Sequence, residues 1–488
     1  MGSREKMAQY DAKRTSIDAA RTENDTCRRR IGQLLDAESF VELDSLVTAR
    51  ELSFGPERPK VTGDGVVTGY GTIDGRLVFL AAQDPDVYGG SIGQMHAKKM
   101  AKALRLAIRA QVPFIGLYDT GGVRVEEGLP GLEGLGEFLA VLDEASGLIP
   151  LIAGVMGPCA GGAAFAVANS DFVLMSEKSP GVFMNGPMVI SAVENKSLGP
   201  AEIGGASVHA EKTGLATLTA ANEEELIAQI KQLMPYIPDS CAGFHQRLTV
   251  DDDPNRTETR LDTLAAAMDE GYDMREAIDL IVDTGSFMEL SPAYASNLIA
   301  GLARLDGITV GILAVAGARV NGGMARKAAS MAALFDRLNL PLIAFVDTEG
   351  YEISSEEESK GLVSASAALM QTMLRLSIPR IGVLTGKAIG SAYLTFGSKV
   401  CGMNFVYAWP TAEIAVVNPD TAAEILYRKD IAASEDPIKA RKDFVKQYAE
   451  EIAGPYVAAS LGHVDEVILP SATRPHLISA LDMLTAVY

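Results

Sequence analysis

The chain has 488 residues, 48% apolar and 22% charged, which is typical of a globular protein with two or three domains. Its formal net charge of −20 argues against nucleic acid as a partner, because binding to phosphates requires an excess of Lys and Arg. The four cysteines are scattered without a CxxC pair, so neither a metal site nor a disulfide framework is indicated.

The first thirty residues are charged and lack an apolar core, so we expect no signal peptide and a cytoplasmic location. Residues 112–118 read as a buried strand, followed by the small-residue turn DTGG (119–122). Residues 149–156 read as a second strand, which leads through GPCAGG (157–162) into an Ala-rich helix. Residues 145–170 carry no charge, but their prolines and glycines favour strand–turn–helix over a membrane span. We therefore expect no direct membrane insertion.

A stretch rich in Pro and Asp, residues 236–260, separates two halves of similar length. It predicts an N-terminal domain over 1–245 and a C-terminal domain over 246–488. Each half alternates short apolar strands with Gly-containing turns and helices, a pattern that indicates an α/β fold.

The second half repeats the first. VPFIGLYDTGG (112–122) matches LPLIAFVDTEG (340–350), and IPLIAGVMGPCAGGAA (149–164) matches IPRIGVLTGKAIGSAY (378–393). LLDAESFVEL (34–43) also matches LIVDTGSFMEL (280–290), and YGGSIGQMHAKK (88–99) matches VNGGMARK (320–327). Four matches in the same order indicate one duplicated domain rather than an array of short repeats.

In each half two small-residue turns follow two apolar strands. Glycine permits close approach of the backbone to a ligand, although a tight strand-to-helix turn produces the same letters. Two N–H groups converging from such turns would form an oxyanion hole, in which one preorganised donor contributes roughly 3 kcal/mol of transition-state stabilisation. A helix N-terminus adds a favourable dipole for the developing negative charge.

The usual nucleophile machinery is missing from the sequence. The five histidines do not recur between the halves, and there is no Ser/His/Asp spacing and no GxxxxGK[ST] phosphate loop. Two holes without a nucleophile suggest two enolate-like oxyanions, one in each half.

A set of motifs spread over nearly the whole chain carries a resemblance to one family. They are GGSIGQMHAKK (89–99), DTGGVRVEEG (119–128), MGPCAGGA (156–163), DFVLM (171–175), IGGASVHAEKTG (203–214), YDMREAI (272–278), ARKAA (325–329) and YAWPTAEIAV (407–416). With these motifs the chain resembles the carboxyltransferase component of biotin-dependent acyl-CoA carboxylases and decarboxylases, such as the propionyl-CoA carboxylase β subunit.

The resemblance implies two tandem crotonase-like (ClpP/crotonase superhelix) domains, with the active site between the N-half of one protomer and the C-half of another. It also implies a dimer or trimer of dimers, acyl-CoA as substrate, and biotin on a biotinyl carrier protein. The further partner would be a biotin carboxylase or a membrane decarboxylase. One hole would hold the biotin enolate oxygen and the other the thioester enolate oxygen, with no side-chain base.

By position, the first pair of turns is assigned to the thioester and the second pair to biotin. The implied catalytic residues are Gly122, Val123, Gly161, Gly162, Ala163, Gly390, Ser391 and Ala392. The implied acyl-CoA contacts are Gly121, Gly122, Gly161, Gly162, Lys98 and Lys99, where the lysines, with Lys102, either meet CoA phosphates or form a solvated face. The implied biotin contacts are Gly350, Tyr351, Gly390, Ser391, Ala392 and Tyr393.

The departures from the family pattern lie mostly in the second half. Glu349–Gly350–Tyr351 stands where the family usually has Pro-Gly-Phe, and Ser391 stands where it usually has Gly. Leu394 replaces the Asp of propionyl-type enzymes, so we expect it to bear on acyl specificity. Three hypotheses follow: a carboxyltransferase, the same site run in reverse as a decarboxylase α subunit, and a biotin-independent crotonase-type acyl-CoA enzyme using a side chain such as Glu127. A catalytically dead scaffold is a further alternative if the altered second half cannot bind biotin.

Overall fold

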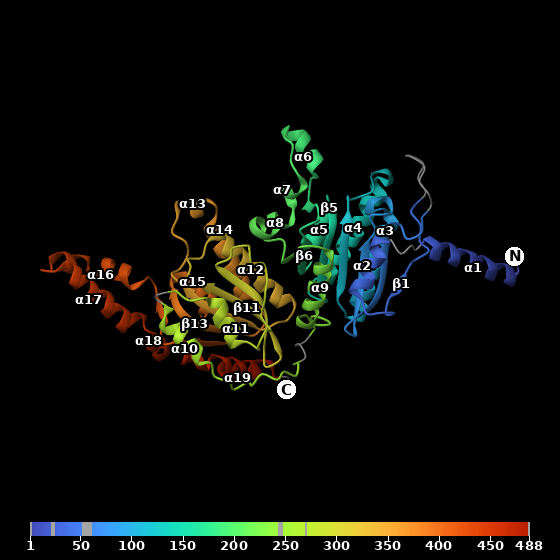
Figure 1. The fold of residues 1–488 in the computed structure, drawn as a ribbon. Helices are drawn as coiled ribbons and strands as arrows, with labels where there is room; N and C mark the ends of the chain where they lie inside the picture. The colour runs from blue at the N-terminus through green and yellow to red at the C-terminus, as the bar shows by residue number, and fades with distance from the viewer. Residues whose placement is uncertain (1, 21–24, 51–60, 243–246, 269–270, 487–488) are drawn as a thin grey trace. The chain divides into compact units, whose positions relative to one another are not determined.

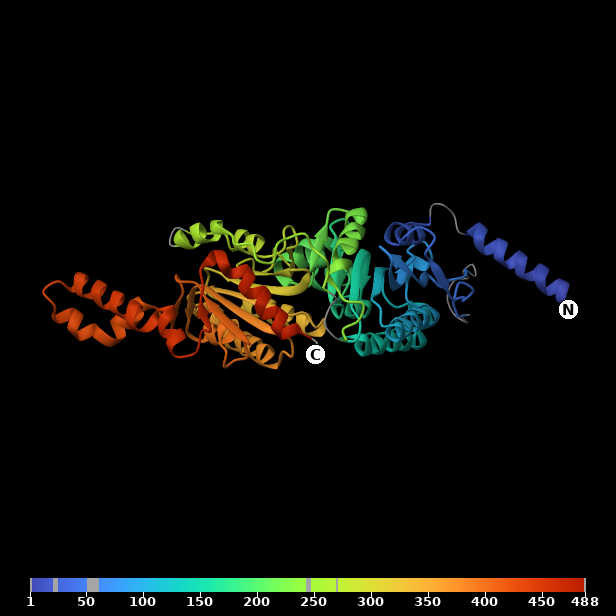
Figure 2. The same ribbon diagram turned by 90° about the horizontal axis from the view of Figure 1, so that it is seen from below.

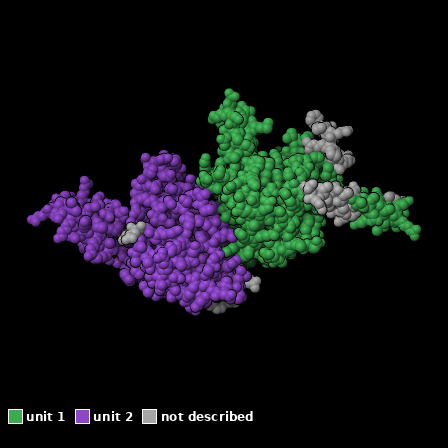
Figure 3. Space-filling view, viewed as in Figure 1, with its two compact units in different colours: residues 1–242 green, residues 243–488 purple. Residues whose placement is uncertain are grey.

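The computed structural model describes residues 2–20, 25–50, 61–242, 247–268 and 271–486. Contacts divide the chain into two units, Met1–Ala242 and Gly243–Tyr488 (Figure 3). The boundary predicted between residues 245 and 246 lies outside the described residues. Each unit is described by itself.

The first unit is built on an eight-stranded sheet (Figure 1). The strands pair in the order β1-β2-β3-β4-β5-β6-β8, with β7 beside the end of β5. The first three strands pair antiparallel, and all later pairings are parallel. The strands are β1 Val41–Leu43, β2 Val66–Ile73, β3 Arg76–Gln83, β4 Phe114–Thr120, β5 Leu151–Ala160, β6 Phe172–Ser176, β7 Val182–Phe183 and β8 Leu218–Ala220.

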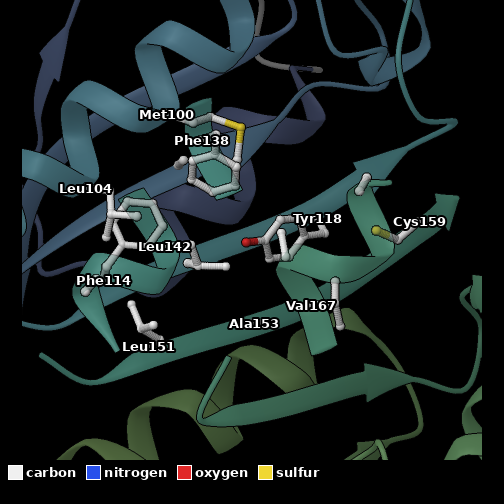
Figure 4. Packing of buried hydrophobic residues seen from close by; sticks show 14 of the residues in the cluster. Met100, Leu104, Phe114, Tyr118, Phe138, Leu142, Leu151, Ala153, Cys159 and Val167 are labelled. Carbon is white, nitrogen blue, oxygen red and sulfur yellow. The ribbon is translucent and has the colours of Figure 1, made fainter. Parts of the chain in front are cut away.

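Helices cover both faces of this sheet. All seven residues of β4 are buried, as expected for a central parallel strand. On one face lie α3 (Gln94–Ala110) and α4 (Leu129–Ala145), whose Met100 and Phe138 pack with Phe114 and Tyr118 (Figure 4). On the other face lie α2 (Thr26–Leu34) and α9 (Glu223–Leu233). The remaining helices are α1 Ser3–Ala20, α5 Ala163–Ala168, α6 Pro187–Glu194, α7 Pro200–Gly204 and α8 Ala206–Val208.

The second unit repeats this topology strand for strand. Its sheet has the order β16-β14-β13-β12-β11-β10-β9, with β15 beside the end of β13. The pairings again change from antiparallel to parallel after the third strand. The strands are β9 Met288–Glu289, β10 Leu298–Leu305, β11 Ile308–Ala316, β12 Leu342–Thr348, β13 Arg380–Ile389, β14 Phe405–Ala408, β15 Glu413–Ala415 and β16 Glu466–Val467.

The second sheet is also covered by helices. The C-terminal α19 (Thr473–Thr485) crosses it (Figure 2). Leu477 and Leu481 of this helix join the core with Ile299 and Val310 of the strands. The predicted α/β fold with an internal duplication is confirmed. The other helices are α10 Thr259–Ala266, α11 Met274–Ile281, α12 Gly322–Arg337, α13 Ser355–Ser359, α14 Leu362–Arg375, α15 Gly390–Gly397, α16 Pro419–Ala433, α17 Pro437–Tyr448 and α18 Pro455–Ser460.

Candidate functional site

In the first unit the turn after β4 meets the turn after β5. Gly122 has φ 104° and Gly161 has φ 66°, conformations that glycine adopts without steric cost. A Cβ atom on Gly122 would lie 2.9 Å from the carbonyl oxygen of Ala160, the residue just before Gly161. The two turns that the sequence singled out therefore lie side by side, and glycine is required where they touch.

The backbone around Gly122 is fixed by hydrogen bonds that leave neighbouring donors unused. Its N–H donates to Thr120 Oγ1 at 3.0 Å, and its carbonyl accepts from the Ile92 N–H at 2.9 Å. Within the described part of the chain, the N–H groups of Val123 and Gly162 have no hydrogen-bond partner. Such donors can stabilise a developing oxyanion. Gly121 is exposed, and Ala163 is buried at the start of α5.

The second unit reproduces this arrangement. Gly350 has φ 108° and Gly390 has φ 62°, and the Gly350 N–H donates to Thr348 Oγ1 at 3.2 Å. A Cβ atom on Gly350 would lie 3.5 Å from the carbonyl oxygen of Ile389, just before Gly390. Here the N–H groups of Tyr351 and Ser391 have no hydrogen-bond partner among the described residues.

Side chains on α15 connect the two turns of the second unit. The hydroxyl of half-buried Tyr351 lies 3.0 Å from Thr395 Oγ1, which donates to the carbonyl of Ser391 at 3.0 Å. Ser391 itself is exposed, and Leu394 is exposed on the same helix, whereas Tyr393 is half-buried and Ala392 buried. The role of Leu394 in acyl specificity and the contact of Tyr393 with biotin stay predictions.

An aspartate that recurs between the halves lies beneath each pair of turns. Asp119 forms a buried ion pair of 2.9 Å with Arg30 and abuts Gly157. Asp347 instead accepts the N–H of Lys387 at 2.9 Å. Burial raises the pKa of both carboxyls, and at Asp119 the guanidinium of Arg30 opposes that rise. The recurrence was visible in the sequence, but the different partners were not.

A buried charged cluster lies directly after the first turn. The Arg124 guanidinium donates to Asp64 at 2.6 Å and to Glu127 at 2.7 Å, and all three side chains are buried. It also donates to the carbonyl of Ser91 at 2.8 Å. Glu127 accepts a further bond from the Gln94 N–H at 2.7 Å. The carboxylate is thus fully engaged, which does not suit the acid–base role considered from the sequence.

The lysines of α3 differ sharply in their surroundings. Lys99 is 2% exposed, and its ammonium donates to the carbonyls of Gly63 and Val66. This placement corrects the expected contact with CoA phosphate, because the amine does not reach solvent. Lys98 is exposed and remains a candidate for contact with CoA phosphates, whereas Lys102 forms an ion pair of 2.7 Å with Asp44.

The burial of Lys99 follows from the duplication. Lys327 on α12 is also 2% exposed and donates to three carbonyls, at 2.7 to 2.9 Å. Each lysine therefore holds the segment leading into the second strand of its sheet. The signal was present in the sequence, because both residues close a repeated motif.

His96 lies fully buried on α3 in a defined neutral tautomer. Its Nδ1 donates to the Asp64 carbonyl at 2.9 Å, and its Nε2 accepts from Gln83 Nε2 at 3.2 Å. Gln83 is oriented by its own carbonyl oxygen, which accepts the Asp119 N–H at 3.0 Å. A second proton on the ring would face the Gln83 amide. Burial, with the nearby Arg124, lowers the pKa of His96 to about 3.

This pKa predicts a specific loss of stability in acid. The unfolded chain binds a proton on His96 near pH 6.5, and the folded chain does not until about pH 3. The contribution is therefore complete above pH 6.5 and falls as the pH drops toward 3, by about 1.4 kcal/mol per pH unit. Urea unfolding from pH 7 to 4 should show a shallower pH slope for His96→Asn than for the wild type. Equal slopes would contradict this role.

Two features are absent from the described residues. No group of three or more His, Cys, Asp or Glu among the described residues could hold a metal ion. No helix in the described ranges is long and apolar enough to cross a membrane.

Comparison with known proteins identifies this arrangement. The family model for the carboxyl transferase domain matches residues 20–487. The chain belongs to the carboxyl transferase family. It is 40% identical to the methylmalonyl-CoA decarboxylase subunit alpha of Veillonella parvula, over 94% of this chain and 90% of that one. It is 39% identical to the propionyl-CoA carboxylase carboxyltransferase subunit of Haloferax mediterranei, again over 94% and 90%.

A solved structure extends the relationship to the fold. The chain superposes with a TM-score of 0.93 on one chain of transcarboxylase 12S, a hexamer whose structure contains methylmalonyl-coenzyme A and methylmalonic acid. The identity is 34%, and the match covers 99% of this chain and 95% of that one. The tandem crotonase-like fold and the main functional prediction, a carboxyltransferase of the biotin-dependent acyl-CoA class, are thereby confirmed.

Proposed function

We propose that this carboxyltransferase exchanges a carboxyl group between biotin on a separate carrier protein and the α-carbon of a short-chain acyl-CoA of the propionyl/methylmalonyl class. The thioester carbonyl binds at the first pair of turns, where Val123 and Gly162 offer N–H groups. The ureido carbonyl of biotin binds at the second pair, where Tyr351 and Ser391 offer them. The observation that carries the proposal is the occurrence of two equivalent pairs of glycine turns with unused donors.

The second pair of turns suits biotin in its donor chemistry. Ser391 is exposed, so a carbonyl oxygen can approach its N–H, and the Tyr351 hydroxyl already has a partner in Thr395. Biotin, when bound, supplies a nitrogen that carries the carboxyl group. At the first pair of turns, the N–H groups stabilise negative charge on the thioester oxygen, which acidifies the α-carbon.

The relatives support both directions of reaction. One is named a decarboxylase subunit and another a carboxylase subunit, at nearly equal identity to this chain. The same two holes serve either direction by microscopic reversibility. We propose assembly as a dimer or trimer of dimers, supported by the hexamer of transcarboxylase 12S, with a biotinyl carrier protein and either a biotin carboxylase or a membrane decarboxylase as partners.

Decarboxylation with free biotin tests the proposed function. The purified chain should release CO2 from methylmalonyl-CoA only when biotin is present. A panel of malonyl-, methylmalonyl- and glutaconyl-CoA would rank the acyl groups and test the role of exposed Leu394. Turnover at the same rate without biotin would overturn the proposal in favour of the crotonase-type alternative.

Glu127→Gln separates the carboxyltransferase from that alternative. Removing a general acid–base group costs about 10²–10⁴ in rate. Because Glu127 is buried against Arg124, we expect instead a loss of unfolding free energy of about 1–3 kcal/mol. The pH profile of turnover should stay unchanged, and the rate should stay within about tenfold of the wild type. Glu133→Gln on the exposed side of α4 is the control, and a hundredfold loss at full stability would favour a catalytic Glu127.

A further inference from the structure

The two units hold their glycine turns in place with different charged side chains. In the first unit, Arg124 follows Gly122 by two positions and donates to the side chain and carbonyl of Ser91, in the segment before α3. In the second unit, the position matching Ser91 is Arg319, in the segment before α12. Arg319 binds Glu349, which precedes Gly350 by one position, at 2.9 Å. Both units therefore link the glycine turn to the segment before the following helix. The first unit does so through the residue two positions after the glycine, and the second through the residue one position before it.

In the second unit, Glu349 also binds a residue next to the turn that follows β13. Glu349 accepts from Lys387 Nζ at 2.7 Å, and Lys387 lies near the end of β13, three residues before Gly390. The hydrogen bond from Lys387 lowers the pKa of Glu349, so the carboxylate stays ionised. One carboxylate thus joins the ends of β12 and β13 and the segment before α12. We call Arg319, Glu349 and Lys387 the edge cluster.

In the first unit, the position that corresponds to Glu349 has no side chain. We call the space beside this position the edge of the hole. Gly121 occupies the position of Glu349, and a Cβ atom there would meet nothing within 4 Å. Pro158 occupies the position of Lys387 and carries no charge. Arg124 binds the first turn on the other side of Gly122, so among the described residues the space beside Gly121 stays unfilled. In the second unit the half-exposed Glu349 and Lys387 side chains fill it.

We propose that the edge cluster determines which ligand the second hole accepts. An open edge at Gly121 leaves room for a thioester whose long CoA arm continues past the hole. The filled edge at Glu349 restricts the second hole to a compact ring carbonyl and excludes the CoA thioester. The cluster also positions the Tyr351 and Ser391 donors, because it links the two turns that carry them. This inference rests on the proposed function, since it assumes that biotin occupies the second hole.

Substitutions at Glu349 in the full-length protein test whether this side chain excludes the CoA thioester from the second hole. Glu349→Gly installs the residue of the first unit, and Glu349→Ala opens the same edge if the glycine variant fails to fold. Glu349→Gln removes the charge but keeps the edge filled. Glu352→Gln is the matched control, because Glu352 occupies the Arg124 position and, among the described residues, its side chain accepts only the neighbouring Ile353 N–H.

The measurement is methylmalonyl-CoA decarboxylation with free biotin, with propionyl-CoA added as an inhibitor. In the wild type, propionyl-CoA should compete with methylmalonyl-CoA but not with biotin. In Glu349→Gly and Glu349→Ala it should compete with both, and the KM for biotin should rise about three- to tenfold, while the KM for methylmalonyl-CoA stays unchanged. Glu349→Gln should raise the KM for biotin without new competition, and Glu352→Gln should change neither.

The outcomes separate the two proposals. In Glu349→Gly and Glu349→Ala, a higher KM for biotin without competition between propionyl-CoA and biotin would overturn the proposed selection of ligands, as would an unchanged KM for biotin in both of these variants. A wild-type enzyme that ignores biotin altogether would instead refute the proposed function.

Discussion

Replacing Gly162 with proline should lower the turnover of methylmalonyl-CoA decarboxylation by about 10²–10³, the cost of removing one oxyanion-hole donor. The Gly162 N–H has no partner in the described part of the chain, so proline removes a functional donor and no structural bond. Gly162 has φ −60°, which matches the fixed φ of proline. The variant should therefore fold, and its circular dichroism spectrum should match that of the wild type.

Gly162→Ala is the matched control for this prediction. Its Cβ atom would lie 2.9 Å from Leu135 Cδ2, as any side chain at this position would, but the N–H remains. The end of a leucine side chain can move, so alanine should cost little turnover. If alanine were as damaging as proline, crowding against Leu135 rather than loss of the N–H would explain the effect.

The fold and the location of the turns could be predicted because their signals are local and occur twice. A positive φ after a buried strand demands glycine, as at Gly122 and Gly350, so the sequence records the backbone conformation directly. The recurrence of these glycines, together with Asp119 and Asp347, marked the duplication. The continuous apolar runs before them identified the central parallel strands.

The charged partners could not be predicted, because they come from distant parts of the chain. Arg124 binds Asp64, 60 residues earlier, because the start of β2 and the end of β4 lie at the same edge of the sheet. The positions of Lys98, Lys99 and Lys102 on one stretch of helix predict either contact with CoA phosphates or a solvated face, and the burial of Lys99 fits neither. Its burial depends on carbonyls of a loop whose path the sequence does not reveal.

Ser391→Pro should strongly lower biotin-dependent turnover while leaving the KM for the CoA thioester near its wild-type value. Ser391 is the second residue of α15, and its N–H has no partner among the described residues, so proline is tolerated in this first turn. The Ser391 carbonyl, which accepts from Thr395, is retained. Losing the donor should reduce turnover by about 10²–10³. Steady-state kinetics with biotin and methylmalonyl-CoA varied separately would locate the defect.

Ser391→Gly tests whether the amide or the hydroxyl is responsible. Ser391 is exposed, and no hydrogen bond of its hydroxyl occurs within the described ranges, so glycine should cost little. This expectation also explains how serine can stand where the family usually has glycine, because both supply the same N–H. If the glycine variant were as impaired as the proline variant, the Ser391 hydroxyl rather than its N–H would be the group that stabilises the oxyanion. The second hole would then be a side-chain site, chemically different from the first.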